Sequence, residues 1–424
     1  MELKRIRKKT FGLHLFIATT LLVFYQGTYI STMSRLKLDF NERFYLSPKG
    51  NVQHQAGTTK NINKVIQKKR KDAIFAYCKA ARVRQISANK SVQLIYSNQF
   101  NLSYFAIPKI GSTFIMQMFS VIRYGLTYAE SNFSIPRNKV HSTAQKRKLF
   151  FYNRTLEETV TIIPVRNPYS RLFSVFVDKV LLPNSIPFRL EILAQKQLRT
   201  LRDLTNLTQP GRIYSSGLSV SFQDFLDYAL NPSIDKKLLY RHYDSCFARL
   251  KSLICNSNHY IIVKQETFET DIQYVLQFVG VDKAEPNTYY RILKSLHESR
   301  VEDSIPGLIK VTFFFAEKYA ELWTGPIVAE LLWQSFQIQG YVSRHLPFPK
   351  RYFNNKFIYM NANITSGIFL REMKKGKLSR IQSMKQRKEA IITAYRGLPK
   401  TVLRKIQTTY DCDFEAFGYD RKLI

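Results

Sequence analysis

Two strand–turn–helix units follow one another over residues 104–180, and they constrain the fold more than any other stretch of the chain. Each unit has a short apolar run, then a turn with a cation and hydroxyl groups, then an amphipathic helix. The first turn spans residues 108–113 and the second spans residues 166–174. Such units are typical of α/β folds, whose ligands bind at the carboxyl ends of parallel strands. The stretch therefore predicts two anion sites that hold two separate groups of one ligand.

The rest of the pattern extends this α/β prediction. Expected strands near residues 94–96, 102–107, 160–165 and 260–263 alternate with expected helices near residues 113–123, 169–182, 222–230 and 270–278. This alternation predicts a parallel α/β sheet with flanking helices. Between about residues 282 and 390 the chain is rich in aromatic and basic residues, and helical patterns cover residues 308–319 and 327–336. We interpret that region as an inserted, helical and basic segment.

The first 72 residues predict the membrane topology of the protein. Residues 1–10 form a basic tail, and residues 11–30 form an uncharged run about as long as the roughly 20 residues that cross a bilayer. The basic flank favours a cytosolic N-terminus, so the body, residues 73–424, is expected in the lumen behind a transmembrane signal anchor. A cleaved signal peptide is the alternative. Residues 31–72 are polar and predict a flexible stem.

Charge and glycosylation motifs narrow the partners. The net charge of +34 indicates polyanionic surroundings, which means nucleic acid, an anionic membrane face or an acidic glycan. A lumenal body disfavours nucleic acid and leaves glycans. Acceptor motifs for N-glycosylation agree with that address; they begin at Asn89, Asn101, Asn132, Asn153, Asn206 and Asn363.

The four cysteines are compatible with two disulfides in an oxidising compartment. Of the three connectivities, the simplest pairs Cys246 with Cys255 and Cys78 with Cys412, and buried free thiols stay open as an alternative. No Cys-x-x-Cys or histidine spacing indicates zinc.

The first turn has the chemistry of a phosphate-type site. Gly111 lets backbone N–H groups approach an anion, and the start of the following helix adds partial positive charge. Lys109 adds a full charge, and Ser112 and Thr113 add donors. The turn lacks the Walker A pattern, and an ordinary Pro/Gly turn with an incidental lysine is the alternative.

The second turn carries an arginine at the predicted end of a strand. Arg166 has a guanidinium fork that matches phosphate oxygens, and Ser174 lies two helical turns further on a face that reaches the same anion. Pro168 suits a first helical turn. An ordinary solvated arginine is the alternative.

Together and in this order, the two turns resemble the 5′-phosphosulfate loop and the 3′-phosphate motif of Golgi carbohydrate sulfotransferases, nearest to the chondroitin, dermatan and N-acetylgalactosamine 4-O-sulfotransferases. Three further segments resemble the same family: His242-Tyr243 before Cys246, residues 263–271, and residues 413–419. The resemblance implies a sulfotransferase fold, which is a P-loop-like parallel sheet with flanking helices. It also implies sulfuryl transfer from 3′-phosphoadenylyl sulfate (PAPS) to a hydroxyl of an acidic or neutral glycan.

The resemblance also implies roles for individual residues. Lys109, Ile110, Gly111, Ser112 and Thr113 would bind the transferring sulfate, with Lys109 stabilising the leaving oxygen. Arg166 and Ser174 would bind the 3′-phosphate. A base must take the acceptor proton, and His141 is the first candidate and His242 the second. No metal is expected, since cationic side chains replace it.

Two other functions stay open at this point. A type II Golgi glycosyltransferase would use an Asp-x-Asp motif for a divalent metal, and Asp411-Cys412-Asp413 has those letters. A non-catalytic, basic glycan-binding membrane protein would use the positive charge alone. Neither the sequence pattern nor the resemblance fixes an oligomeric state.

Overall fold

The structure is a computed structural model of the 424-residue chain. It describes residues 56–81, 94–124, 159–185, 187–189, 191–195, 220–234, 239–297, 301–318, 325–353 and 361–422.

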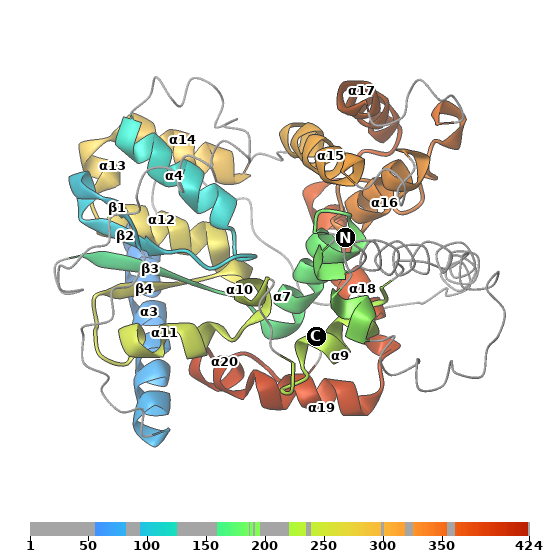
Figure 1. Cartoon of the computed structure of the whole chain (residues 1–424). Helices are drawn as coiled ribbons and strands as arrows, with labels where there is room; N and C mark the ends of the chain where they lie inside the picture. The colour runs from blue at the N-terminus through green and yellow to red at the C-terminus, as the bar shows by residue number, and fades with distance from the viewer. Residues whose placement is uncertain are drawn as a thin grey trace, which may run out of the picture.

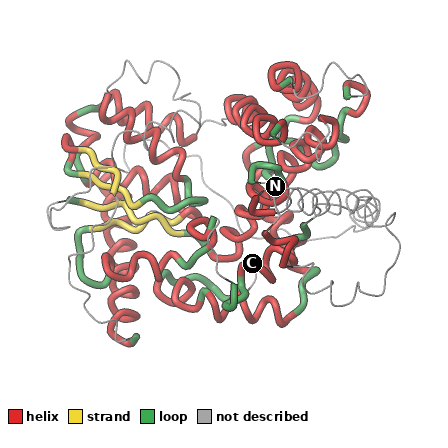
Figure 2. The backbone as a smooth tube through the Cα atoms, viewed as in Figure 1, coloured by secondary structure: helices red, strands yellow, loops and turns green. Residues whose placement is uncertain are grey.

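The core of the fold is a four-stranded sheet with the order β1-β2-β3-β4. Figure 2 draws its strands in yellow. The strands are β1 (Leu94–Ser97), β2 (Leu102–Phe105), β3 (Val160–Val165) and β4 (Tyr260–Lys264). β2, β3 and β4 are parallel, as predicted, but β1 pairs antiparallel with β2. The prediction of a purely parallel sheet was therefore wrong at one edge. The reason is that only a short turn, η1 (Asn98–Phe100), joins β1 to β2, and a parallel crossover needs a dozen or more residues.

Helices cover both faces of this sheet (Figure 1). On one face lie α4 (Ser112–Tyr124), α12 (Phe268–Phe278) and α14 (Pro286–His297), and on the other lie α3 (Ala56–Ala80), α11 (Cys246–Ile254) and α20 (Asp411–Ala416). Successive residues of β3 serve different faces, because Ile162 packs in the first layer and Ile163 in the second. Burial on both faces explains why the strands are almost continuously apolar.

Helix α3 begins inside the region that we expected to be a flexible stem. Its Gln67 side chain donates from Nε2 to the carbonyl of Ile262 (2.9 Å) and accepts from the N–H of Ile262 (3.0 Å). Arg70 donates to the same carbonyl and to both oxygens of Asp271, each at 2.8 Å. These contacts satisfy the backbone of the edge strand β4. The folded body therefore begins before Ala73, and residues 56–72 belong to it.

A disulfide joins α3 to the end of α11. It links Cys78 to Cys255, whereas Cys246 and Cys412 are free thiols. The predicted pairs Cys246–Cys255 and Cys78–Cys412 were therefore wrong. The cause is the early start of the folded body: α3 packs beside α11 and brings Cys78 to Cys255, while Cys246 is buried in the same layer.

We expect Cys78→Ser to lower the free energy of unfolding by about 2–5 kcal/mol, since the disulfide closes a loop with a sequence separation of 177 residues. Urea denaturation of the oxidised protein measures the effect. Cys412→Ser is the matched control, because Cys412 is a free, partly buried thiol in the same layer. Equal stability of the Cys78→Ser variant and the wild type would contradict the pairing.

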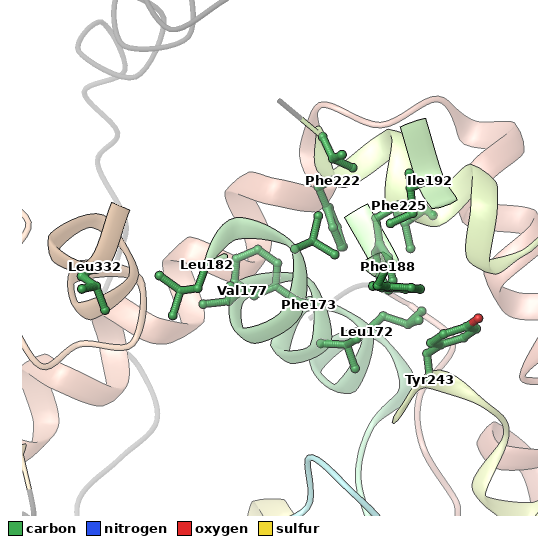
Figure 3. Close-up of a cluster of buried hydrophobic side chains, with 14 of the residues drawn as sticks. Leu172, Phe173, Val177, Leu182, Phe188, Ile192, Phe222, Phe225, Tyr243 and Leu332 are labelled. Atoms are coloured by element: carbon green, nitrogen blue, oxygen red, sulfur yellow. The ribbon is translucent and has the colours of Figure 1, made fainter. Parts of the chain in front are cut away.

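A second, helical core lies beyond the sheet and is built around the continuous helical segment α7 (Pro168–Val175) and η3 (Phe176–Leu181). Figure 3 shows apolar side chains of this cluster, among them Phe173 and Val177 of that segment and Leu332 of α16. The surrounding helices are α9 (Phe222–Ala229), α10 (Tyr240–Tyr243), α15 (Val301–Glu317), α16 (Gly325–Ile338), α17 (Ala362–Met373), α18 (Arg380–Arg396) and α19 (Lys400–Thr409).

The helical character predicted for the region 282–390 is confirmed by α13 (Val281–Ala284) and by α14 to α18. The region is not peripheral, however. Its buried residues Ile309, Trp333 and Phe369 belong to the same core as α7, so the segment that follows β3 is packed against it.

Among the described residues, no helix is long and apolar enough to cross a membrane. The predicted span, residues 11–30, lies outside the described residues.

Candidate functional site

The loop between β2 and α4 has the backbone of an anion site. Lys109 and Gly111 both have positive φ angles, 70° and 64°, on either side of the buried Ile110. Alternation of this kind turns successive backbone N–H groups toward one point, as in anion-binding concavities. Ser112 and Thr113, both half-buried, form the first turn of α4 directly after the loop. The positive φ angles at Lys109 and Gly111 are compatible with the predicted phosphate-type site, and anion binding by residues 109–113 stays a prediction.

Glycine is needed at position 111 for two reasons. Its φ angle lies in the left-handed region, and a Cβ atom there would lie 2.6 Å from the Phe268 ring. Phe268 begins α12, which follows β4 after the short helical turn η4 (Gln265–Thr267). The loop is therefore pressed against the segment that follows the edge strand.

The Lys109 side chain is directed to an acidic partner on η3. Its Nζ forms an ion pair with Oδ2 of Asp178, and the two side chains are only 9% and 14% exposed. Nζ of Lys179 lies 3.4 Å from the same oxygen. Two lysines therefore share one carboxylate in a half-buried setting, where charges are screened less than at the surface.

His242 lies beside these charges. Burial, together with the positive charges of Lys109 and Lys179, lowers the pKa of its imidazole to about 3, although the negative charge of Asp178 opposes this shift. Its Nδ1 atom is buried and has no hydrogen-bond partner among the described residues. We refer to Lys109, Asp178, Lys179 and His242 as the lysine cluster. In it, His242 is a neutral imidazole at ordinary pH.

His242 should make the protein sensitive to acid. An unfolded imidazole has a pKa near 6.5, so between pH 6.5 and 3 the unfolded chain binds a proton that the folded chain does not. Its contribution to stability is complete above pH 6.5 and falls by about 1.4 kcal/mol per pH unit down to pH 3. We expect His242→Gln to lose less stability than the wild type over this range in chemical denaturation. Parallel stability curves for the two proteins would contradict this.

Arg166 connects the second predicted site to the first. It follows the last residue of β3, and its Nε donates to the Ser170 hydroxyl (2.8 Å) while its NH1 donates to the carbonyl of Lys109 (2.9 Å). Burial lowers the pKa of Arg166 to about 10, and the carboxylate of Glu266 opposes that effect. The guanidinium stays charged at ordinary pH. The structure therefore places two cationic side chains at the ends of two neighbouring strands.

The C-terminal segment reaches the same place through Glu266. That carboxylate accepts from the backbone N–H of Asn167 (3.0 Å) and from the hydroxyl of Tyr419 (3.0 Å). The sequence segments around residues 263–271 and 413–419 thus support the turn that carries Arg166.

Two residues predicted for this site, Ser174 and His141, stay predictions. Ser174 lies one turn beyond Ser170 on α7 and is half-buried, but the hydroxyl that contacts Arg166 belongs to Ser170. His141 lies outside the described residues. Sequence reasoning missed Ser170 and Asp178, although the spacing of four residues from Arg166 to Ser170 was available as a signal for the first.

The Asp-x-Asp letters near the C-terminus have a structural role. The carboxylate of Asp413 accepts from the Ser245 hydroxyl (3.0 Å) and from the N–H groups of Cys246 (3.0 Å) and Phe247 (2.6 Å). It therefore caps the first turn of α11. Asp411 forms an ion pair with Arg421. Both carboxylates are thus engaged in structural contacts, which argues against a nucleotide-sugar metal site at this motif.

Comparisons with known proteins identify the family of the chain. Residues 92–306, just over half of the chain, match a family described as the sulfotransferase family. Carbohydrate sulfotransferase 11 of Mus musculus is 25% identical over 228 residues, which cover 51% of this chain and 62% of that protein. Carbohydrate sulfotransferase 12 of Mus musculus is 28% identical over 207 residues (45% and 48%), and carbohydrate sulfotransferase 9 of Homo sapiens is 28% identical over 229 residues (51% and 48%). The chain thus spans about half to three fifths of the length of these relatives. No solved structure matches the chain.

Proposed function

The chain belongs to the sulfotransferase family, and from this premise we propose that it transfers a sulfuryl group from PAPS to a hydroxyl of a glycan. The observation that carries the proposal is the joining of the two cationic sites: the Arg166 guanidinium donates to the carbonyl of Lys109 at 2.9 Å. PAPS has a phosphosulfate at one end and a 3′-phosphate at the other. Two linked cationic sites at neighbouring strand ends fit such a donor.

The residues divide the work between the two ends of the donor. The N–H groups of the loop, the start of α4 and the Lys109 ammonium would bind the phosphosulfate. Arg166 would bind the 3′-phosphate, with Ser174 as the second predicted ligand. The acceptor oxygen forms a bond to sulfur while the bond from sulfur to the bridging phosphate oxygen breaks, and that oxygen keeps the electron pair. Lys109 stabilises the charge that develops there.

The proton of the acceptor hydroxyl needs a base. His242 is the predicted base inside the described part of the chain, and its pKa of about 3 makes it a weak base in the donor-free protein. A bound anionic donor would raise that pKa, because negative charge favours the imidazolium. His141 stays the other predicted base.

We further propose a Golgi address with the body in the lumen, anchored by residues 11–30. The disulfide between Cys78 and Cys255 supports an oxidising compartment. The relatives named above are carbohydrate sulfotransferases, which supports a glycan acceptor. Protease protection of the body in sealed microsomes tests the topology, and digestion of the body in intact vesicles would refute it.

The decisive experiment incubates the full-length protein with radiolabelled PAPS and a panel of acidic and neutral glycans. We expect label on at least one glycan and competition by 3′-phosphoadenosine 5′-phosphate (PAP). Absence of both donor binding and transfer would refute the enzyme and favour a basic protein that binds glycans by charge alone.

A further inference from the structure

Asp178 uses its two carboxylate oxygens for different partners. Oδ2 receives Lys109 and, at 3.4 Å, Lys179, whereas Oδ1 accepts from the Asn184 side-chain amide at 3.3 Å. The same Asn184 amide also donates to the backbone carbonyl of Asp178 at 3.1 Å. The Asn184 side chain therefore fixes both the main chain and the side chain of Asp178, the residue that pairs with Lys109.

Asn184 is itself held by the helical region. The Thr312 hydroxyl on α15 donates to Oδ1 of Asn184 at 2.8 Å, which leaves the Asn184 amide hydrogens for Asp178. Thr312 is fully buried and Asn184 is 6% exposed, within an otherwise apolar core. Buried polar groups stabilise a fold little unless each finds a partner. Thr312, Asn184 and Asp178 each have such a partner. Together they form a chain of polar contacts that runs from Thr312 through Asn184 and Asp178 to Lys109.

The charges near Lys109 indicate what this chain of contacts does. Lys179 on η3 shares the Asp178 carboxylate with Lys109, and its positive charge disfavours a positive charge on Lys109. His242 on α10 lies beside both lysines and is neutral at ordinary pH, so it does not offset that repulsion. Asp178 is the carboxylate that opposes it. Loss of this negative charge would lower the pKa of Lys109, because a nearby carboxylate favours the charged form of a lysine.

We propose that Asp178 is a positioning residue that keeps Lys109 charged and aimed for sulfuryl transfer, and that Asn184 and Thr312 hold Asp178 in place. The helical region containing α15 is thereby part of the catalytic apparatus. This inference rests on the proposed function, since it assigns a role within the same reaction.

The test compares four variants of the full-length protein with labelled PAPS and an acceptor glycan. Asp178→Asn removes the charge at constant shape, Asp178→Glu retains it, and Thr312→Val removes the distal hydroxyl. Glu317→Gln is the matched control, because Glu317 is exposed on the same helix as Thr312. The measured quantities are kcat, the KM for PAPS, the affinity for PAP and the pH profile of kcat/KM from pH 5 to 10.

For Asp178→Asn we expect kcat to fall by about 10- to 100-fold while PAP binds as tightly as before or tighter, since a negative charge beside the anion site is gone. The alkaline limb of its pH profile should move to lower pH by about one unit or more. Thr312→Val should lower kcat about three- to ten-fold with a smaller shift in the same direction. Asp178→Glu should restore the alkaline limb, and Glu317→Gln should behave as the wild type.

A purely structural role would weaken PAP binding and kcat together and leave the pH profile in place, and that result would overturn the proposal. If Asp178→Asn does not fold, the PAP affinity and the pH profile of Thr312→Val and Asp178→Glu test the proposal instead. A different outcome would reject only this inference: the wild type transfers sulfate, Lys109→Ala does not, and the Asp178 and Thr312 variants behave as the wild type. The proposed function would then still hold. Absence of transfer by the wild type rejects both.

Discussion

Lys109→Ala should abolish sulfuryl transfer, with a loss in kcat of about 10³-fold or more, while the protein still folds and binds PAP. Removal of a single preorganised group that stabilises developing charge costs about 10²–10³-fold, and a full cation at the leaving oxygen lies at the upper end of that range. Lys109 is also 9% exposed and held by Asp178, so water does not replace it well.

The fold should survive this substitution for a specific reason. Asp178 keeps a second cation, because Lys179 lies 3.4 Å from the same oxygen. Steady-state transfer from labelled PAPS gives kcat, and calorimetric titration with PAP gives the affinity. Lys251→Ala, an exposed lysine on α11, is the matched control and should retain full activity. Transfer by Lys109→Ala at more than about a tenth of the wild-type rate would remove Lys109 from the reaction.

Arg166→Ala should weaken the binding of PAP by about 10²-fold or more. Truncation of one partner of a buried, hydrogen-bonded charge pair costs about 2–5 kcal/mol or more, and a bound 3′-phosphate would be that partner. Arg166 also fixes the loop, since it donates to the carbonyl of Lys109 at 2.9 Å. The substitution should therefore lower kcat as well as affinity.

Arg166→Lys should not rescue the binding. The guanidinium donates to Ser170 and to the loop through separate nitrogens, and a single ammonium does not reproduce that fork. Titrations with PAP at fixed ionic strength measure the effect, and Arg396→Ala, an exposed arginine on α18, controls for the loss of one positive charge. If Arg166→Ala and Arg396→Ala bind PAP equally well, the 3′-phosphate lies elsewhere.

The two experiments also separate the two ends of the donor. Loss of kcat with intact PAP binding is expected at Lys109, and loss of PAP binding is expected at Arg166. The reverse pattern would exchange the assignments of the two turns.

Much of the site was predictable because its elements are local. Four apolar runs predicted the four strands, and the Gly111 turn and the arginine after β3 predicted the two cationic positions. These features depend on residue types a few positions apart, and the backbone geometry that they require, such as a positive φ at Gly111, is set by the same short segments.

The antiparallel direction of β1 was harder to predict from the sequence. Its apolar pattern predicts a strand but does not say which neighbour it pairs with or in which sense. The short connection to β2 carries that information, and the prediction of a wholly parallel sheet did not use it.

What the sequence by itself determined is the fold class, the strands and helices that bear the site, and the cationic residues at the two strand ends. Only the tertiary structure decided which side chains meet: Gln67 with Ile262, Cys78 with Cys255, and Thr312 with Asn184, at sequence separations of 195, 177 and 128. The physical reason is that helical and strand periodicity fixes which face a residue occupies, whereas its partner across a core is chosen by packing between elements that are distant in the chain. The carboxylate facing Lys109 is held by such a partner, so its role became visible only when α15 was packed against the segment that follows β3.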